Sequence, residues 1–528
     1  MGYLVEQKRS KLFNEFNLEE QEKYFSQSGK KFIPHVDTLY YSIFIKGDCK
    51  ARKEYDANDT VKLPDGMYDF IDFLSYAKSQ FNEYGEDFWF DYDKSLLFRR
   101  MSFARIYDFC IGKEGYYDIF IASSIPNNST PRIVVQLRSI GLWAIGEYEL
   151  IKECYDAVKD LLFEYDLEIF KCQENRIDFC YHTNAIQNPK MFYGDETLEN
   201  HLSTTLSLGS KIFNVVNKGD TNTIDVSYLS LGMRTSNNIF FRSYNKVREV
   251  IEKGYKGFFI EFWFNSKLIN YYDYYVYTYA ISKGQCYDYI YLGMLEFYLE
   301  FGHDPAIKEK FLALKNAKSF SLVNIKKVVP LYCPMPTLVL NIEYQCMRKF
   351  FYSADKFFEV QAISHECEYH PLLKLFQILD NRKEFLKYLT SYTVSFKKKI
   401  SSPVRDSKGH YDEEIYLDFW KRLRRVKLDS TINIGFYREY TRKTNKQLLV
   451  SRLKGVMASL SLYDDNWDTD INEDMSNLIC ILNDNDVINN DDGTCSIVDD
   501  EYLKIKEKKK KALKSTLKPS RPSNNLNK

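Results

Sequence analysis

The stretch "LGMRTSNNIFFRSYNKVRE", residues 231–249, places a tyrosine between an arginine and a lysine at two-residue spacing. Alternate side chains of a β-strand share one face and lie about 6.6 Å apart. A strand over 239–246 therefore puts Arg242, Tyr244 and Lys246 on one face, and mainly apolar and small side chains on the other. The sequence predicts a phenol flanked by two positive charges on one side of a sheet.

A second strand-like segment also carries polar side chains inside an apolar run. In "NRIDFCYHTN" (175–184), alternation places Arg176, Asp178, Cys180 and His182 on one face and apolar side chains on the other. Burying a polar or charged group without a partner costs free energy. We therefore expect these side chains to pair with other charged groups or to bind a ligand.

A third segment, "GYKGFFIEFWFN" (254–265), is an aromatic run interrupted by Glu261, and we interpret it as a strand. Asp178 and Glu261 could simply pair with cations, and such pairing does not exclude a metal site. Arg242, Tyr244 and Lys246 could equally be ordinary solvated strand residues. Alternation alone favours that plainer interpretation.

Composition limits the class of protein. The chain has 528 residues, of which 45% are hydrophobic, which is enough for a sizeable core and for several domains. No apolar run is long enough to span a membrane, and the first residues lack the apolar core of a secretory signal. The 11 cysteines include no C-x-x-C pair. This pattern is typical of reduced thiols in the cytoplasm.

Charge is unevenly distributed although the formal net charge is +0. Residues 464–501 hold 13 Asp and Glu and no Lys or Arg, whereas 504–528 hold 10 Lys and Arg against one Glu. Residues 397–452 hold 15 Lys and Arg against 7 Asp and Glu, a local charge of +8. Such a basic region is suited to contact with phosphate backbones.

The order of elements predicts an α+β fold with a largely antiparallel central sheet and flanking helices, followed by a mainly helical C-terminal domain. We expect a helical lead-in over 1–35, a domain built on the antiparallel sheet over 36–265 and a mainly helical DNA-binding or accessory region over 266–463. Residues 464–528 are poor in hydrophobic residues and segregated in charge. They predict a disordered tail, acidic and then basic, with one short helix near 475–483.

Within the basic region, "IYLDFWKRLRRVK" (415–427) reads as an amphipathic helix with an apolar face at Ile415, Phe419, Leu423 and Val426. Four cations lie mostly off that face, namely Lys421, Arg422, Arg424 and Arg425. Contact with DNA and a merely solvated helix face are equally compatible with this pattern.

The segment 228–263 resembles the core of the replication initiation factor family, the trans-acting Rep proteins of rolling-circle plasmids and related relaxases of conjugative elements. The family pattern is matched by "YLSLGMRTS", by "FFRSYNKVRE" and, more loosely, by "FFIEFWF", "NRIDFCYH" and "VDTLYYSIF". The chain departs from that pattern at Phe259, where the family often has Arg, and at His182, where it often has a second Asp.

The resemblance implies strand nicking by attack of Tyr244 on a phosphodiester, with Arg242 and Lys246 as neighbouring cations. A phenol is a poor nucleophile at its ordinary pKa of about 10, and nearby cations favour the phenolate. The implied cofactor is Mg²⁺ or Mn²⁺, for which Asp178, His182 and Glu261 are the candidate ligands. Arg234, in the family motif, is a candidate DNA contact.

The implied function is site-specific nicking and joining that starts rolling-circle plasmid replication. The expected partner is origin DNA, as a duplex with an extruded hairpin or as a single-stranded nick site, and a host helicase and polymerase would follow. A homodimer is compatible with the sequence, and no membrane is expected. Two alternatives stay open: a relaxase that starts conjugative transfer, and a DNA-binding protein of the same fold without catalysis.

Overall fold

The structure is a computed structural model. It describes residues 10–26, 29–48, 64, 66–84, 89–91, 96–99, 106–124, 130–187, 200–206, 228–232, 238–317, 321–351, 369–398, 415–426, 487–489 and 495–497. The chain divides into two compact units, one formed by 1–405 with 411–438 and the other by 406–410 with 439–528.

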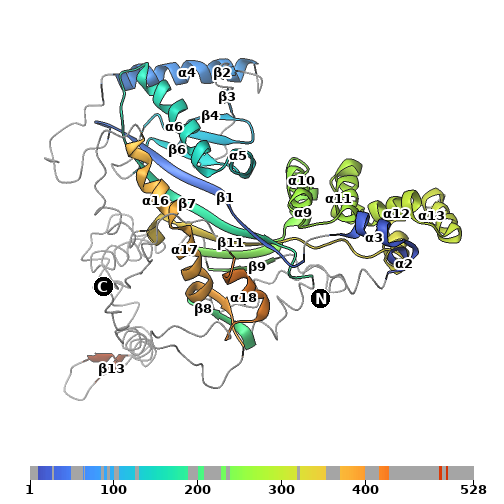
Figure 1. The fold of residues 1–528 in the computed structure, drawn as a ribbon. Coiled ribbons are helices and arrows are strands. Elements are labelled where there is room, and N and C mark those ends of the chain that lie inside the picture. Colours follow the sequence, from blue (N-terminus) through green and yellow to red (C-terminus); the bar gives the residue numbers. More distant parts are fainter. Residues whose placement is uncertain are drawn as a thin grey trace. The chain divides into compact units, whose positions relative to one another are not determined.

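The first unit is built on a ten-stranded sheet in which all neighbouring strands are antiparallel (Figure 1). The spatial order is β2-β3-β4-β5-β6-β1-β7-β11-β10-β9. In chain order the strands are β1 (Phe32–Ile45), β2 (Trp89–Asp91), β3 (Leu96–Phe98), β4 (Phe109–Lys113), β5 (Tyr117–Ile121), β6 (Ile133–Leu137), β7 (Ile169–Thr183), β9 (Tyr228–Leu231), β10 (Ile239–Asn245) and β11 (Leu340–Met347).

The side chains alternate as the sequence predicts in the two strands that matter most. Along β10, burial alternates strictly between buried and partly exposed residues. In β7, Ile177, Phe179 and Tyr181 join the main hydrophobic core, while the residues between them face the other side of the sheet. The α+β prediction with a largely antiparallel sheet is confirmed.

One irregularity in β1 affects the polar face of the sheet. The register of β1 against β7 shifts between Val36 and Thr38, so that Asp37 is an extra residue in the ladder. Val36 remains opposite Phe179 on the core side. A β-bulge of this kind redirects a side chain, and Asp37 is directed towards Lys246.

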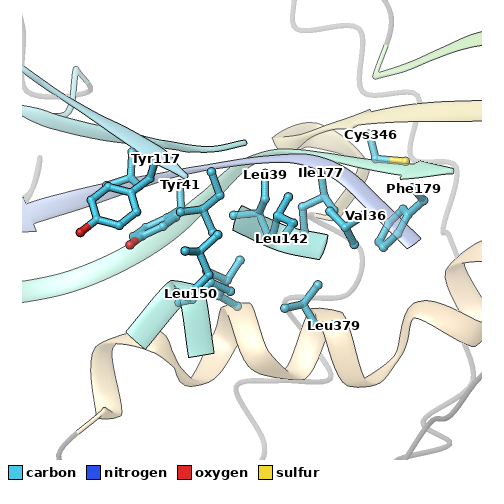
Figure 2. Packing of buried hydrophobic residues seen from close by; sticks show 14 of the residues in the cluster. Val36, Leu39, Tyr41, Tyr117, Leu142, Leu150, Ile177, Phe179, Cys346 and Leu379 are labelled. Carbon is cyan, nitrogen blue, oxygen red and sulfur yellow. The ribbon is translucent and has the colours of Figure 1, made fainter. Parts of the chain in front are cut away.

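The apolar face of the sheet is covered by helices α4 (Gly66–Tyr84), α5 (Ser139–Ala144), α6 (Glu147–Phe163) and α16 (Leu373–Asp380). Figure 2 shows Leu142, Leu150 and Leu379 of these helices close to Leu39 and Ile177 of the sheet. Burying one such side chain contributes about 1.5–3 kcal/mol, so this layer fixes which face of the sheet is left for polar groups.

A second hydrophobic core is almost entirely helical, and much of it comes from the first part of the region 266–463 that was expected to be mainly helical. It contains α2 (Lys11–Glu15), α3 (Leu18–Phe25), α9 (Lys246–Lys253), α10 (Phe258–Asn265), α11 (Tyr271–Gly284), α12 (Ile290–Phe301), α13 (Pro305–Asn316) and α14 (Leu322–Val328), with the 3-10 turns η2 (Tyr287–Tyr289) and η3 (Val329–Leu331). Its helices appear together in Figure 1. Gly293 permits close approach of α12 to α11, because a Cβ there would lie 2.7 Å from the Val276 carbonyl oxygen.

The remaining elements follow β11 along the chain. They are η4 (His370–Leu372), α17 (Arg382–Tyr388), the π-helical turn η5 (Leu389–Thr393), β12 (Val394–Phe396), which pairs with β8 (Leu202–Thr204), and α18 (Asp418–Arg424). In the second unit, β13 (Val487–Asn489) pairs with β14 (Cys495–Ile497). The rest of the expected tail and its predicted helix lie outside the described residues.

The predicted strand over 254–265 is wrong, because most of this segment forms helix α10. Phe259, Ile260 and Trp263 are buried on one side of the helix, whereas Glu261 is exposed. A strand would have had to bury aromatic rings on both faces, while a helix buries one side against the second core and leaves the glutamate in water.

A central strand comes from the region expected to be mainly helical. β11 lies between β7 and β10, so the sheet draws on residues from both 36–265 and 266–463. Among the described residues, no helix is both long and apolar enough to cross a membrane.

Candidate active site

Four adjacent strands direct polar side chains to the sheet face opposite the main core. β1 supplies His35 and Asp37, β7 supplies the 176, 178, 180 and 182 positions, β11 supplies 341, 343 and 345, and β10 supplies 242 and 244. We call this set the polar face. It forms because the alternation of each strand is in register with that of its neighbours.

Tyr244 lies at the centre of a small hydrogen-bond cluster. Its phenolic oxygen accepts hydrogen bonds from Lys246 Nζ at 3.2 Å and from Asn341 Nδ2 at 3.0 Å. The Arg242 guanidinium lies over its ring, 5.0 Å from the centroid. The structure thus brings together the three residues that the sequence placed on one strand face.

Arg242 is held in place by a carboxylate from the neighbouring strand. Glu343 lies opposite Arg242 in the ladder, and its Oε1 is 2.9 Å from Arg242 Nη2. The fully buried Glu343 also accepts hydrogen bonds from Asn341 at 3.1 Å and Gln345 at 2.7 Å. Burial lowers the pKa of Arg242, but Glu343, with smaller effects of Tyr244 and Asp178, more than offsets it, so the arginine pKa is raised.

Lys246, the first residue of α9, is fully buried among acidic partners. Its Nζ lies 2.9 Å from Glu249 and 3.4 Å from Asp37. Burial raises the pKa of Asp37 and of Glu249, but Lys246 and Lys256 lower it, and the combined effect of the nearby charges leaves both pKa values below normal. The ammonium therefore stays charged next to the Tyr244 phenol, and its own pKa is raised.

The electrostatic balance at Tyr244 differs from the sequence expectation that cations would favour its phenolate. Burial raises the pKa of Tyr244 well above 10, and the opposing effect of Lys246 is smaller. Glu343, Glu249 and Asp37 add to the increase. In the free protein the Tyr244 side chain is accordingly a neutral phenol.

Asp178 is buried and engaged with its own strand neighbour. Arg176 donates to its two carboxylate oxygens, from Nε at 2.7 Å and from Nη2 at 2.5 Å. Burial and the nearby Glu343 nevertheless raise the pKa of Asp178 to about 7, against the effect of Arg176. Both oxygens are thus occupied by a guanidinium.

His182 is packed into an aromatic cluster. Trp263 of α10 donates its indole N–H to His182 Nδ1 at 3.0 Å, which leaves the proton of the neutral imidazole on Nε2. Burial and the neighbouring His35 lower the His182 pKa well below 6.5. The rings of Trp143 and Phe259 also lie against it.

Glu261 is not brought to Asp178 and His182. In a helix such as α10, each residue is rotated by about 100° about the helix axis, so side chains two residues apart point to nearly opposite sides. Trp263 contacts His182, so Glu261 lies on the opposite, exposed side of the helix, where it bonds to Tyr274. Glu261 is therefore kept away from Asp178 and His182 by the same tertiary packing that makes 258–265 a helix.

The structure instead gathers His35, Asp37 and Cys180 closely enough for their donor atoms to lie within 4.8 Å of one another. His35 Nε2 is 2.9 Å from the Cys180 sulfur, and burial lowers the His35 pKa to about 3. Mg²⁺ and Mn²⁺ prefer several oxygen ligands. One carboxylate already paired with Lys246, a thiol and an imidazole do not fit such an ion.

The predicted DNA contacts divide into three cases. Arg234 lies outside the described residues. On α18, Arg422 is exposed and Lys421 is half-buried, and Arg425, which directly follows the helix, is exposed. Arg424 instead turns inward, where it donates to Ser391 and lies over the Tyr416 ring at 4.2 Å.

The apolar face of that helix also differs from the prediction. α18 begins at Asp418, and its fully buried side chains are Trp420 and Leu423. Ile415 is buried but precedes the helix. The Trp420 indole donates to the Thr390 carbonyl at 2.8 Å, a tertiary contact that sets the orientation of the helix.

Several residues of the polar face were not singled out from the sequence. They are His35, Asp37, Asn341, Glu343 and Gln345. For the last three a signal exists, because "LNIEYQCM" alternates polar and apolar residues as a half-buried strand does. The position of Asp37 depends on a bulge, for which the sequence carries no clear sign.

Comparison with known proteins adds little to this geometry. No family model matches the chain, and no curated protein matches it. It is similar to a solved structure described as "Structure of Rolling Circle Replication Initiator Protein from Geobacillus stearothermophilus", with a TM-score of 0.31 and 11% sequence identity. The alignment covers 75% of this chain and 96% of that chain. A similarity of this strength establishes neither a shared fold nor a shared activity.

Proposed function

We propose that this protein nicks and rejoins one DNA strand at a replication origin, with Tyr244 as the nucleophile, and so initiates rolling-circle replication of a plasmid. The observation that supports this most directly is the environment of the Tyr244 oxygen, which has Lys246 at 3.2 Å and Asn341 at 3.0 Å. The proposal also rests on the sequence resemblance of 228–263.

In the proposed reaction, the Tyr244 oxygen attacks the scissile phosphorus and forms an O–P bond. The bond from phosphorus to the 3′-oxygen breaks, and the phenolic proton ends on that oxygen, which leaves as a 3′-hydroxyl. The product is a phosphotyrosine on the 5′ side of the break. Rejoining reverses these steps, because the phosphodiester energy is kept in the covalent intermediate.

Lys246 and Arg242 have different tasks in this scheme. Lys246 donates to the attacking oxygen, so its contact strengthens as negative charge develops there. Arg242 is about a quarter exposed and fixed by Glu343, which suits it to a non-bridging oxygen of the scissile phosphate. Both cations favour the transition state over the neutral phenol of the free protein.

A divalent cation, when bound, would supply Lewis-acid polarisation of a phosphoryl oxygen. Metal dependence stays a prediction, but Asp178, His182 and Glu261 do not lie together as one set of ligands, because Glu261 is on the exposed side of α10. We route no step through the ion. Origin DNA, a host helicase and polymerase, a homodimer and a cytoplasmic location likewise stay predictions. The division into a nicking domain over 36–265 and an accessory region over 266–463 also stays a prediction, although β11 of the second range supplies Asn341 to the proposed site.

Two other functions share parts of this site. A relaxase that starts conjugative transfer would use the same chemistry on a different DNA. A DNA-binding protein without catalysis would keep the fold but form no covalent adduct. The raised pKa of Tyr244 is the one observation that favours the last of these.

The test removes one atom pair, the phenolic O–H of Tyr244. We expect Tyr244→Phe to fold normally and to bind origin DNA, but to form no nicked product from a supercoiled origin plasmid. Tyr255→Phe is the matched control, because Tyr255 is near in sequence and 65% exposed. Wild-type protein incubated with a single-stranded nick-site oligonucleotide and Mg²⁺ or Mn²⁺ should carry the nucleotide adduct on Tyr244 after peptide mapping.

Nicking by Tyr244→Phe at the wild-type rate, or an adduct on another tyrosine, would remove Tyr244 from the reaction. An adduct on Tyr244 with a transfer-origin oligonucleotide but not with a replication origin would identify a relaxase. Absence of any adduct with intact DNA binding would support the non-catalytic alternative.

A further inference from the structure

A ladder of polar side chains continues across the sheet from Tyr244 to strands that the proposed reaction does not use. Arg242 is opposite Glu343, whose oxygen accepts from Gln345. Gln345 is opposite Asp178, which binds Arg176. The ladder thus crosses from β10 through β11 to β7 without a break.

The ladder then continues through β1 and β6 to β5. Arg176 is opposite Tyr40, Tyr40 is opposite Gln136, and Gln136 is opposite Asp118. Asp118 binds Arg138, which donates from Nε at 2.5 Å. Arg99 adds a second guanidinium, with Nε 3.5 Å from the same carboxylate.

In each charged pair of this ladder the acid is buried against the sheet and the arginine is partly exposed. The carboxylates of Asp118, Asp178 and Glu343 are 0–1% exposed, whereas their arginine partners are 24–36% exposed. The acids lie beneath and fix the guanidiniums above them. Each guanidinium keeps further N–H donors beyond those bonded to the carboxylate, and these are the groups a ligand would meet.

Aromatic rings lie beneath the same cations. Arg176 lies over the Tyr40 ring at 5.4 Å, as Arg242 lies over Tyr244 at 5.0 Å. Tyr40 in turn packs on a small apolar cluster that includes Phe120. At two places along the ladder a guanidinium plane thus lies over a tyrosine ring, and such a plane can stack on a base or donate to a phosphate.

We propose that this ladder, here called the polar track and represented by Arg242, Arg176, Tyr40, Arg138 and Arg99, binds single-stranded DNA that continues from the scissile phosphate. The inference rests on the proposed function of Tyr244. From β10 to β5 the track crosses five strand spacings of about 4.8 Å, or about 24 Å. A stacked DNA strand advances about 3.4 Å per nucleotide and an unstacked one advances further, so the track holds at most roughly seven nucleotides.

Single-stranded DNA fits better than a duplex because the track depends on exposed base faces. The guanidiniums and rings are spread over a sheet surface and not along a protruding helix. A duplex keeps its bases stacked inside and would offer only phosphates to such a surface. The buried carboxylates also reduce the net charge of the track, which weakens purely electrostatic binding of a duplex.

The test measures binding without cleavage, in the full chain carrying Tyr244→Phe. The probe is a fluorescent single-stranded DNA of about twelve nucleotides, longer than the track, followed by anisotropy over a range of salt concentrations. The variant is Arg138→Gln, because Asp118 keeps Arg99 as a partner. The control is Arg382→Gln on α17, whose arginine is similarly exposed but pairs with Glu147 on the opposite side of the sheet.

We expect Arg138→Gln to weaken single-strand binding about fivefold at 0.1 M salt and to reduce the salt slope by about 0.7, the value for one lost phosphate contact. Binding of the matching duplex and the thermal midpoint should stay unchanged, and Arg382→Gln should bind as the parent does. Unchanged single-strand affinity, an equal loss for the duplex, or an equal loss in the control overturns the track. If the wild-type protein bound single-stranded DNA but did not nick it, the result would count against the role of Tyr244 and leave the binding result for the track standing.

Discussion

Glu343 connects the stability of the protein to the chemistry proposed for Tyr244. The carboxylate is fully buried and accepts from Arg242, Asn341 and Gln345. Glu343→Gln keeps the size and shape of the side chain but removes its charge. Hydrogen bonds to charged groups contribute about 1 kcal/mol more than neutral ones, so three such bonds give a loss of about 3 kcal/mol.

The amide that Glu343→Gln introduces must also place its N–H₂ group against one of the side chains that donated to the carboxylate. The least costly adjustment is rotation of the Asn341 amide, whose Oδ1 has no hydrogen-bond partner among the described residues. Asn341 would then present an oxygen both to the new amide and to Tyr244. The phenol would donate to that oxygen in place of accepting from Asn341 Nδ2, which stabilises its neutral form. We therefore expect the nicking rate to fall at least tenfold.

Urea unfolding at neutral pH measures the stability term, with the midpoint compared at constant m-value. Glu168→Gln is the matched control, since Glu168 is 69% exposed and pairs with Lys46 on the surface. Exposed pairs contribute less than about 1 kcal/mol. If Glu343→Gln lost no more stability than this control, Glu343 would not act as a buried charged acceptor, and the coupling to Tyr244 would have no basis.

Three further predictions concern other parts of the chain. The pKa of His35 is lowered to about 3 by burial, so the folded state binds fewer protons than the unfolded state between about pH 3 and 6.5, and stability is lost as pH falls through that window. His35→Phe should remove about 1 kcal/mol of the wild-type loss between pH 6.5 and 5.5 in urea unfolding, and equal pH slopes would contradict it. Gly293→Ala should lower stability by about 1–3 kcal/mol, because its Cβ would meet the Val276 backbone; an unchanged melting temperature would show that α11 and α12 can separate. Arg422→Ala should weaken origin binding and its salt dependence without changing stability, whereas Arg424→Ala, which removes internal contacts, should destabilise the protein; the reverse pattern would make Arg424 the DNA contact.

The sequence determined the faces of the central strands. Alternation alone assigned Arg242 and Tyr244 to one side of β10 and Asp178 and His182 to one side of β7, and the structure places them so. Two-residue periodicity is a local property, because consecutive side chains of an extended chain must point in opposite directions. It also predicted the α+β class, which is confirmed.

The sequence did not determine what lies opposite those faces. The segment with Glu261 contains apolar residues at nearly every position, which fits a strand buried on both sides or a helix against a core. Only the second core, formed with helices far along the chain, selects the helix. The β11 strand carries a local alternation signal, but its position between β7 and β10, which are at least 95 residues away in sequence, is set only by tertiary structure.

Tertiary structure also decided the chemistry of the individual groups. Asp37 reaches Lys246 through a bulge in β1, and Glu343 reaches Arg242 from a strand that the sequence analysis did not recognise. The pKa of Tyr244 is raised because burial outweighs its cations, although the sequence shows only the cations. Desolvation depends on everything packed around a group, whereas strand alternation depends only on the residue and its neighbours in the chain.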